Sequence, residues 1–306
     1  MGQRRRKGRP ISGLIVIDKP TGRSSNHVLQ QIKRLFNAQK AGHTGNLDPL
    51  ATGVLPICLG EATKLSSYLL AGDKRYQVTA QLGVATDSAD ADGNIIATSR
   101  VPTLDEEKVS AVLQQYLGQQ TQIPPMYSAL KVNGQPLYKL ARQGIDVKRK
   151  ERAITIDAIN LIKLTDRSLT LDVACSKGTY IRTLIEDIAQ SLDTLAHVTM
   201  LRRTYAAGYT LHQAHTIAEI TAIAEQGESA LDQSLQAVET ILPNWHKLVL
   251  SAEQSQQIQY GQTIQYQETQ QVGMVSLYNE QGKMLGIGDV SELSVVSPKR
   301  LFVFPN

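Results

Sequence analysis

The sequence predicts an α+β fold, with a mixed, largely antiparallel sheet flanked by helices and a small β-rich domain at the C-terminal end. Two segments, 75–82 and 168–175, alternate between apolar and polar residues with the two-residue period of a half-buried strand. Segments 24–36 and 181–192 instead show the apolar spacing of amphipathic helices. After about residue 240, short alternating stretches interrupted by glycines replace the helical pattern, which predicts the β-rich domain.

The N-terminal part of the chain is predicted to contain a strand, a helix and an irregular loop. Residues 11–17 form the expected buried strand, and the helix after it begins at a cap supplied by Ser24 or Ser25. Segment 42–53 contains three glycines and a proline, a composition that favours a shaped loop over a helix or strand. The loop holds one carboxylate, Asp48, and the proline after it biases this residue toward an extended backbone. A lone acid held in this way suggests a positioned catalytic group.

The middle of the chain contains the clearest strand and helix patterns. Thr103 and Glu106 have the spacing of a capping box, which predicts a helix that begins there and stops at Gly118. Each remaining element has one predicted inward face: Tyr76, Val78, Ala80 and Leu82 in the first strand; Leu169, Leu171, Val173 and Cys175 in the second; and Ile181, Leu184, Ile185, Ile188 and Leu192 in the helix that follows.

Length and composition bound the class of protein. A chain of 306 residues, 42% of them hydrophobic, can form one large domain and a smaller one. Cys58 and Cys175 are too few for a disulfide framework and lack metal-ligand spacing, so both are expected to be buried thiols in a reducing compartment. No apolar run approaches the length of a membrane span. We therefore expect a soluble, cytoplasmic protein, and a monomer because no large exposed apolar stripe is evident.

Basic residues are concentrated in two segments, although the net charge of the chain is only +4. Residues 1–10 carry five basic side chains and no acidic one, and residues 131–152 carry seven basic and two acidic ones. In contrast, residues 204–246 contain no Lys or Arg. The pair Asn133-Gly134 is a strong turn signal, so part of the second basic segment is expected to protrude. Such concentrations favour a nucleic-acid partner; a solvated tail and an exposed loop are the alternative interpretation.

A second informative segment, 175–182, joins the strand 168–175 to the helix after it. Gly178 permits a tight turn there, so Lys177, Tyr180 and Arg182 are expected to cluster at one strand–helix corner. Rigid elements hold side chains well at such corners, which favours a functional site. A surface corner with a solvated arginine is the alternative.

Three other patterns carry less weight. Segment 87–93 has the acidic spacing of a calcium loop but lacks the bidentate Glu at its end, so an acidic turn is the better interpretation. His212 and His215 have helical spacing, but no Cys or third His near them completes a zinc site. No glycine-rich nucleotide-binding motif occurs, so no cofactor is expected.

The Asp48 loop and the segment 175–182 together resemble the signatures of the TruB family of pseudouridine synthases. The resemblance runs in order from the first strand to about residue 205, and it returns near Pro298-Lys299-Arg300. One departure is Asn46, where the family has a smaller residue or Thr. The other matching motifs are Leu14-x-x-x-Asp18-Lys19-Pro20, Gly60-Glu61-Ala62-Thr63-Lys64, Lys74-Arg75-Tyr76, Pro125-Met126-Tyr127-Ser128-Ala129-Leu130-Lys131 and Leu201-Arg202-Arg203.

The resemblance implies a specific reaction: conversion of the uridine at position 55 in the T loop of tRNA to pseudouridine, by base flipping and without a cofactor. It implies that Asp48 is the catalytic carboxylate, that Arg182 holds it ionised, and that Tyr76 stacks on the flipped uracil. Tyr76 or Tyr180 would assist the final proton removal. A carboxylate at position 48 is compatible with attack on the sugar carbon and with attack on the uracil ring.

The resemblance also implies a set of substrate-binding residues. His43 would fit into the opened T loop, Tyr180 and Leu201 would line the uracil pocket, and Lys19 would pack against the Asp48 loop. The expected substrate-binding set is His43, Tyr76, Tyr180, Leu201, Lys19 and Lys64.

The implied domain organisation has three parts. A basic tail (1–10) precedes a catalytic domain (11–245), whose basic insert at about 124–152 forms a mobile RNA-binding thumb, and a PUA-like RNA-binding domain (246–306) follows. The expected partner is the T arm of tRNA, with no membrane and no required protein partner. Two alternatives are a tRNA-folding chaperone, which would not need Asp48, and a guide-dependent pseudouridine synthase of a ribonucleoprotein, which shares the loop.

Overall fold

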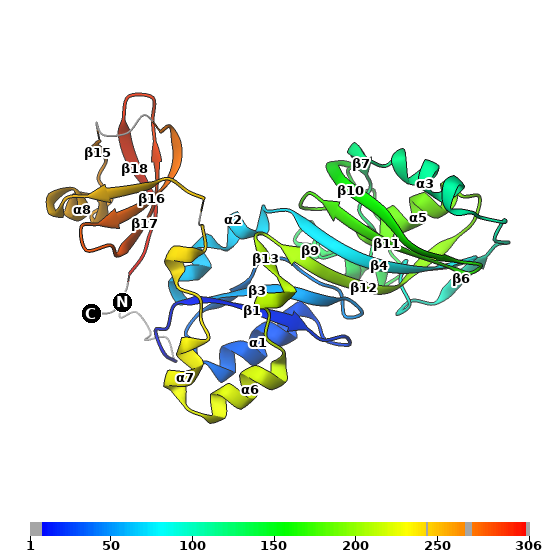
Figure 1. Cartoon of the computed structure of the whole chain (residues 1–306), viewed down its shortest axis with the longest axis horizontal. Helices are drawn as coiled ribbons and strands as arrows, with labels where there is room; N and C mark the ends of the chain where they lie inside the picture. The colour runs from blue at the N-terminus through cyan, green and yellow to red at the C-terminus, as the bar shows by residue number, and fades with distance from the viewer. Residues whose placement is uncertain (1–7, 243, 267–270, 304–306) are drawn as a thin grey trace.

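The main body of the protein is built on one large β-sheet (Figure 1). The structure is a computed structural model, and it describes residues 8–242, 244–266 and 271–303. Arg4, Arg5, Arg6 and Lys7 of the predicted basic tail lie outside the described residues. The strands of this sheet are β1 (Gly13–Lys19), β2 (Ala41–His43), β3 (Thr52–Leu59), β4 (Lys74–Leu82), β7 (Gly118–Gln122), β10 (Arg152–Thr165), β11 (Ser168–Cys175), β12 (Ala196–Ala206) and β13 (Tyr209–Thr210).

The strands follow the order β1-β3-β12-β4-β11-β10-β7, with β2 and β13 paired to β3 and β12. The pairing of β12 with β3 is parallel, and the other pairings in this sheet are antiparallel. The prediction of a mixed, largely antiparallel sheet is therefore confirmed.

The β1 end of the sheet is covered on both faces. Ile15 and Ile17 face the helices α1 (Ser25–Leu35), α6 (Ile217–Glu225) and α7 (Glu228–Gln233). Leu14 and Val16 face the other way, toward η1 (Gly60–Leu65) and α2 (Ser66–Leu70). Burial on both faces explains why β1 is a continuous apolar run rather than an alternating one.

The other half of the sheet packs against α3 (Glu106–Gln114) and α5 (Ile181–Ser191). The inward faces predicted for β4, β11 and α5 are buried. The capping box predicted at Thr103 is wrong, because the side chain of Asp105 accepts a hydrogen bond from the Lys108 N–H and caps the helix. Aspartate is as good a cap as threonine and lies directly before the first helical residue. The helix also ends at Gln114, earlier than predicted, and Gly118 (φ 82°) instead begins β7.

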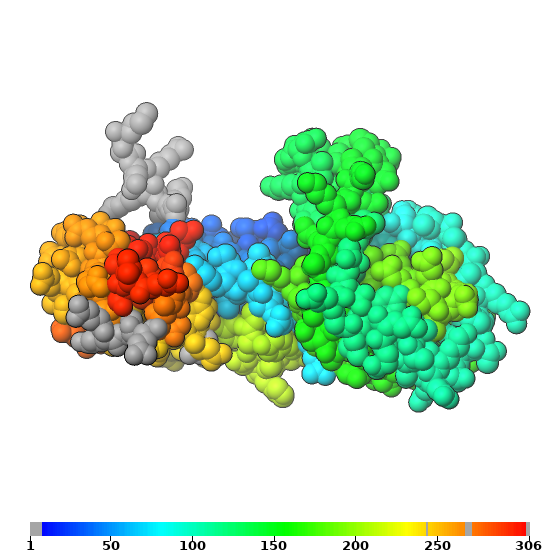
Figure 2. Space-filling view, turned by 90° about the horizontal axis from the view of Figure 1, so that it is seen from above, coloured from blue at the N-terminus to red at the C-terminus, as the bar shows by residue number. Residues whose placement is uncertain are grey.

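Two excursions leave the large sheet. The first is the hairpin β5 (Val84–Thr86) and β6 (Ile95–Thr98), whose connection carries the acidic segment 87–93. The second lies in the thumb and contains β8 (Lys131–Val132), β9 (Gln135–Pro136) and α4 (Leu137–Ala141). Asn133 and Gly134 both have positive φ between β8 and β9, which confirms the predicted turn. The thumb is the green segment that projects beyond the upper edge of the molecule in Figure 2.

The C-terminal part forms a separate small sheet with strand order β14-β16-β17-β18-β15. Its core includes Leu248, Ile258, Val275 and Leu277, and a second apolar cluster joins it to the η1 side of the large sheet. Its elements are β14 (Lys247–Leu250), α8 (Ala252–Gln259), β15 (Ile264–Gln265), β16 (Gly273–Asn279), β17 (Met284–Val290) and β18 (Val295–Leu301). Two short 3-10 helices, η2 (Leu211–Gln213) and η3 (Val238–Thr240), precede this part of the chain.

Two further expectations concern single features. Cys58 and Cys175 are both buried and free, as predicted. In the described part of the chain, every helix is too short or too polar to cross a membrane.

Candidate active site

A cavity of about 560 Å³ opens where the Asp48 loop, β4, β12 and the corner after β11 meet. The β-sheet register explains part of this convergence, because Tyr76 of β4 lies directly opposite Arg203 of β12. The cavity is lined by five of the eight residues that the sequence suggested for the site: Asp48, Tyr76, Tyr180, Arg182 and Leu201.

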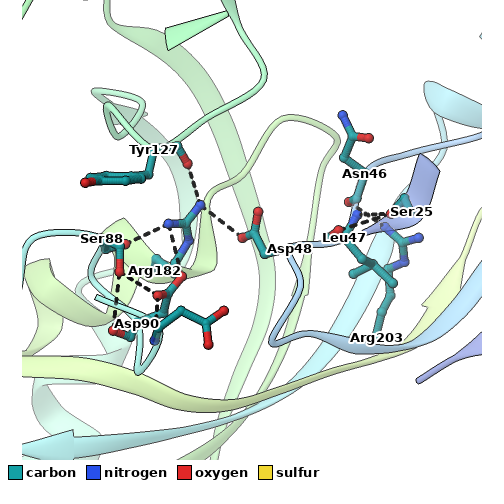
Figure 3. A network of polar contacts seen from close by, with 10 residues as sticks. Ser25, Asn46, Leu47, Asp48, Ser88, Asp90, Tyr127, Arg182 and Arg203 are labelled. Carbon is teal, nitrogen blue, oxygen red and sulfur yellow. Dashed lines mark hydrogen bonds and ion pairs between the residues drawn. The ribbon is translucent and has the colours of Figure 1, made fainter. Parts of the chain in front are cut away.

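Asp48 and Arg182 form an ion pair at the edge of this cavity (Figure 3). The distance between Asp48 Oδ2 and Arg182 Nη2 is 3.0 Å. The two side chains differ in exposure: 40% of the carboxylate side chain is accessible and only 5% of the arginine. The Arg182 side chain is thus buried in the protein, whereas the Asp48 carboxylate is accessible to a molecule in the cavity.

Arg182 is held by three further groups, from two other parts of the chain. Its Nη1 lies 3.2 Å from Asp90 Oδ2 and donates to the Ser88 carbonyl at 2.6 Å, and its Nη2 donates to the Tyr127 carbonyl at 2.7 Å. Tyr127 lies at the base of the thumb. One guanidinium therefore connects the Asp48 loop, the 87–93 turn and the thumb.

Asp90 is a site residue that the sequence reasoning missed, since the segment 87–93 was interpreted only as an acidic turn. The Asp90 carboxylate is buried and also accepts hydrogen bonds from Ser88 Oγ at 2.5 Å and the Asp92 N–H at 3.2 Å. One signal was available: no Lys or Arg occurs between Arg75 and Arg100, so an acid buried there needs a cation from elsewhere in the chain.

The surroundings shift the pKa values of the cavity residues. Burial raises the pKa of Asp48 above its ordinary value, and the positive charge of Arg182 is the strongest influence in the opposite direction. Burial also raises the pKa of the Tyr76 and Tyr180 hydroxyls. Both tyrosines are therefore neutral hydrogen-bonding groups at neutral pH.

Lys19 supports the Asp48 loop from below and does not reach the cavity. Its side chain is fully buried, and its ammonium donates to the carbonyls of Arg23 (2.5 Å), Pro20 (2.9 Å) and Pro49 (3.3 Å). Burial lowers the pKa of Lys19 to about 8. The Lys19 ammonium is thus surrounded by main-chain oxygens, one of them from the Asp48 loop, and its expected substrate-binding role stays a prediction.

Lys64 and His43 also lie outside the cavity lining. The Lys64 ammonium pairs with Glu61 and donates to the Leu301 carbonyl at 2.6 Å, so it joins the large sheet to the C-terminal part. Lys64 therefore lies outside the pocket lining, and its expected substrate-binding role stays a prediction. His43 is half-buried at the end of β2, and its Nδ1 is buried with no hydrogen-bond partner among the residues that the structure describes. Burial, together with the charge of Arg203, lowers the pKa of His43, so its imidazole is neutral at neutral pH.

Four more cationic side chains line the cavity: Lys74, Arg152, Lys177 and Arg203. Within the described residues, none of the four has a carboxylate within ion-pair distance. Burial, with a further contribution from Arg203, lowers the pKa of Lys74 to about 8. A cavity with one accessible carboxylate, an aromatic ring and several unpaired cations is suited to chemistry on a nucleotide of a polyanion.

Comparisons with known proteins agree with this geometry over nearly the whole chain. Residues 33–181 match the model of the TruB family pseudouridylate synthase N-terminal domain. Residues 182–243 match the tRNA pseudouridylate synthase B C-terminal domain, and residues 247–302 match the pseudouridine synthase II TruB C-terminal domain. The fold is thus that of a pseudouridine synthase.

Relatives of known name are similar over their full length. The tRNA pseudouridine synthase B of Actinobacillus pleuropneumoniae is 46% identical, covering 98% of this chain and 99% of the relative. That of Stutzerimonas stutzeri is 48% identical, with coverage of 98% and 99%. The chain belongs to the TruB family and is a tRNA pseudouridine synthase.

A solved structure supports the fold independently. A chain of a Cbf5-Nop10-Gar1 complex superposes with a TM-score of 0.73 at 23% identity, covering 95% of this chain and 85% of that one. At this level of identity the likeness concerns the fold.

Proposed function

We propose that this enzyme isomerises the uridine at position 55 in the T loop of tRNA to pseudouridine, with Asp48 as its catalytic carboxylate. The observation that carries the proposal is the Asp48–Arg182 ion pair, whose carboxylate is accessible from a cationic cavity walled by Tyr76, Tyr180 and Leu201. The names of the full-length relatives support tRNA as the substrate.

The target base is stacked inside the T arm and has to be extruded to reach this cavity, at a cost of a few kcal/mol. Tyr76 offers an aromatic face, and stacking on such a face contributes about 1–3 kcal/mol per base. Leu201 and Tyr180 form the remaining wall. We assign His43 to the opened T loop outside the cavity, where a neutral imidazole can stack among bases without a charge to desolvate.

The reaction breaks the N–C glycosidic bond, rotates the uracil and forms a C–C bond at C5. The proton displaced from C5 must leave, and N1 of the product gains a proton, so no redox change occurs. Arg182 favours the ionised form of Asp48, which both nucleophilic attack and stabilisation of a cationic sugar require. Tyr76 and Tyr180 carry their protons at neutral pH, so either would serve the final step by relaying a proton.

The flanking parts have proposed roles in RNA binding. The thumb, 124–152, would close over the T arm, and Arg182 couples its base to the catalytic loop through the Tyr127 carbonyl. The C-terminal domain, 246–306, would act as a PUA-like module that contacts tRNA away from the T loop, while 11–245 form the catalytic domain.

Tritium release from bare tRNA labelled at uridine C5 tests the proposal. The purified wild type should release one equivalent per tRNA, and Asp48→Asn should release none while still binding tRNA. Binding without release by both proteins would favour the chaperone alternative. Release that required an added guide RNA would favour the guide-dependent alternative.

A further inference from the structure

Arg203 is a buried guanidinium that lies beneath the Asp48 loop and lines the cavity. Its side chain is among the largest that are fully buried in the described protein, at 1% exposure. Among the described residues no carboxylate lies within ion-pair distance of it, although the adjacent Arg202 pairs with Asp18 at 2.7 Å. Keeping an unpaired cation buried is costly, so its hydrogen bonds have to compensate.

The Arg203 guanidinium donates three hydrogen bonds to main-chain carbonyls at the two ends of the Asp48 loop, in addition to a side-chain hydrogen bond with Tyr76. Its Nε donates to Val54 at 2.7 Å, its Nη1 to Asn46 at 3.3 Å and its Nη2 to Gly45 at 3.4 Å. One planar group thus connects the segment before Asp48 to the strand after it. Figure 3 shows Arg203 beside Asn46 of the first of these segments. The fixed fork of five donors makes this possible for arginine and not for lysine.

Two glycines allow the loop to lie this close to Arg203. Gly53 has φ 103°, and a Cβ there would lie 2.1 Å from the Arg203 carbonyl oxygen. Gly45 has φ 146°, and its Cβ would lie 3.4 Å from Arg203 Nη1. Gly53 therefore allows the strand after the loop to pair closely with the main chain of Arg203, and Gly45 supplies the positive φ beside its guanidinium. The side chain of Asn46 is exposed, and its main-chain carbonyl accepts from Arg203.

We propose that Arg203 is a positioning residue for the reaction: by connecting Gly45 and Asn46 to Val54, its guanidinium sets the carboxylate of Asp48 against Arg182. A second contact fixes the same loop from the helix side, where Ser25 Oγ accepts from the Leu47 N–H at 2.7 Å. Ser25 is hydrogen-bonded to one loop residue, whereas Arg203 connects the segment before Asp48 to the strand after it. The proposal rests on the catalytic role proposed for Asp48.

The decisive variant is Arg203→Lys, which keeps the charge and most of the packing but cannot reach carbonyls on both segments. We expect the single-turnover rate of tritium release at saturating enzyme to fall about 100-fold, because small displacements of reacting groups have effects of this size. The dissociation constant for tRNA should change less than about threefold, since the lysine keeps the positive charge that Arg203 presents to the cavity. Rates are expressed per tRNA-binding-competent enzyme, so partial unfolding does not imitate the effect.

The pH profile of the single-turnover rate separates positioning from a purely structural role. Burial already raises the pKa of Asp48, and the charge of Arg182 opposes it. When Asp48 is no longer aligned with Arg182, this opposing influence weakens and the pKa rises further, so the acid limb of the profile should move to higher pH. Because Arg203→Lys preserves the charge, this shift reports geometry. The other charged and titratable groups around Asp48 are Arg182, Asp90, Lys19, Tyr76 and Tyr180. Tyr76 is hydrogen-bonded to Arg203, but burial keeps the pKa of its hydroxyl above the ordinary value and so outside the acid limb.

Arg202→Lys is the matched control, on the same strand and one residue away. Arg202 donates to Asp18 and to Thr52 Oγ1, and it does not contact residues 45–50. It should lower the melting temperature without changing the rate or the pH profile. A wild-type rate and profile in Arg203→Lys would overturn the proposal. A wild type that releases no tritium would instead refute the proposed function.

Discussion

At the scale of single residues, the site depends on one arginine shared by two carboxylates in different environments. Asp90 is buried against Arg182, whereas Asp48 is accessible from the cavity. A guanidinium with fixed fork geometry can satisfy both acids at once. The buried acid thereby orients the arginine, and the arginine in turn aligns the proposed catalytic acid.

The first prediction concerns Asp90→Asn, which preserves the shape of the side chain and removes its charge. Arg182 would lose its buried counter-ion and its fixed orientation, so the single-turnover rate should fall by about 10- to 100-fold. The affinity for tRNA should stay nearly constant, because Asp90 does not line the cavity. Rapid-quench measurement of tritium release, with binding measured by filter retention, checks both values.

Asp92→Asn is the control for this experiment. Asp92 lies in the same turn and is exposed, and only its main-chain N–H contacts Asp90. Its substitution should leave the rate unchanged. Equal losses in both variants would attribute the effect to the turn as a whole rather than to the ion pair.

At the scale of secondary-structure elements, helix α5 contains a buried acidic residue close to the site, and its ionisation lowers the stability of the fold. Glu186 lies one helical turn after Arg182, and burial, with the nearby charge of Asp187, raises its pKa to about 7. The native state therefore binds the Glu186 proton more tightly than the unfolded state. Its contribution to stability is present below the ordinary carboxyl pKa and is lost as the pH rises toward 7.

Glu186→Gln should remove this pH dependence. The amide resembles the protonated acid, so the variant should melt higher than the wild type at pH 8, by roughly 2 °C or more. The difference should shrink as the pH falls toward 4.5. Thermal unfolding followed by circular dichroism across this range measures it, and a variant less stable than the wild type at pH 8 would contradict the prediction.

Sequence periodicity predicted the strands and helices that bury one face against the protein core and expose the other. The inward faces of β4, β11 and α5 were predictable because alternation and helical spacing record burial directly. The start of α3 was not, since Thr103 and Asp105 are both good caps and only the folded backbone selects between them. A buried strand at 11–17 was predictable from its apolar run, and its burial on both faces became evident from the structure.

The site was predictable only in part, because its contacts are non-local. Motif resemblance pointed to Asp48 and Arg182, which the structure brings together, while their catalytic roles stay predictions. Asp90 escaped notice because its partner lies far along the chain, and Arg203 because it makes main-chain contacts that leave no periodic signal. Lys64, in contrast, lies in a motif that matches the family, but its contacts connect the two sheets and it does not line the pocket.

At the scale of the whole molecule, one carboxylate joins the two sheets. Glu61 of η1 is 8% exposed and accepts from Lys40, Lys64 and the Val303 N–H. Burial alone would raise the pKa of Glu61, but these hydrogen bonds outweigh it and the pKa is lowered. Its contribution to stability is therefore present above the ordinary carboxyl pKa and is lost as the pH falls.

Glu61→Gln should weaken this junction by about 2 kcal/mol at neutral pH, because charged hydrogen bonds are replaced by neutral ones. The loss should disappear as the pH falls below about 4. Limited proteolysis should release a fragment containing residues 247–303 faster than in the wild type. Glu253→Gln, an exposed change on α8 in the same small domain, is the control and should behave as the wild type.

The thumb provides the last prediction, which concerns the charge that the molecule presents to RNA. Lys148 and Lys150 are exposed and have no ion-pair partner among the described residues, whereas Arg149 is engaged with Asp146 and the Pro124 carbonyl. If the thumb closes on the T arm, the two lysines displace counterions from phosphates. Each such contact contributes about 0.7–0.9 to the magnitude of the slope of log Kd against log salt concentration.

The double variant Lys148→Ala/Lys150→Ala should therefore reduce the slope of log Kd against log salt concentration by about 1.5. The single-turnover rate at saturating enzyme should stay near that of the wild type, because neither lysine lines the cavity. Lys108→Ala/Lys163→Ala removes the same charge from α3 and from the distal part of β10, and should leave the slope unchanged. Equal slopes for all three proteins would mean that the thumb lysines do not contact phosphates, and that the basic segment is a solvated surface after all.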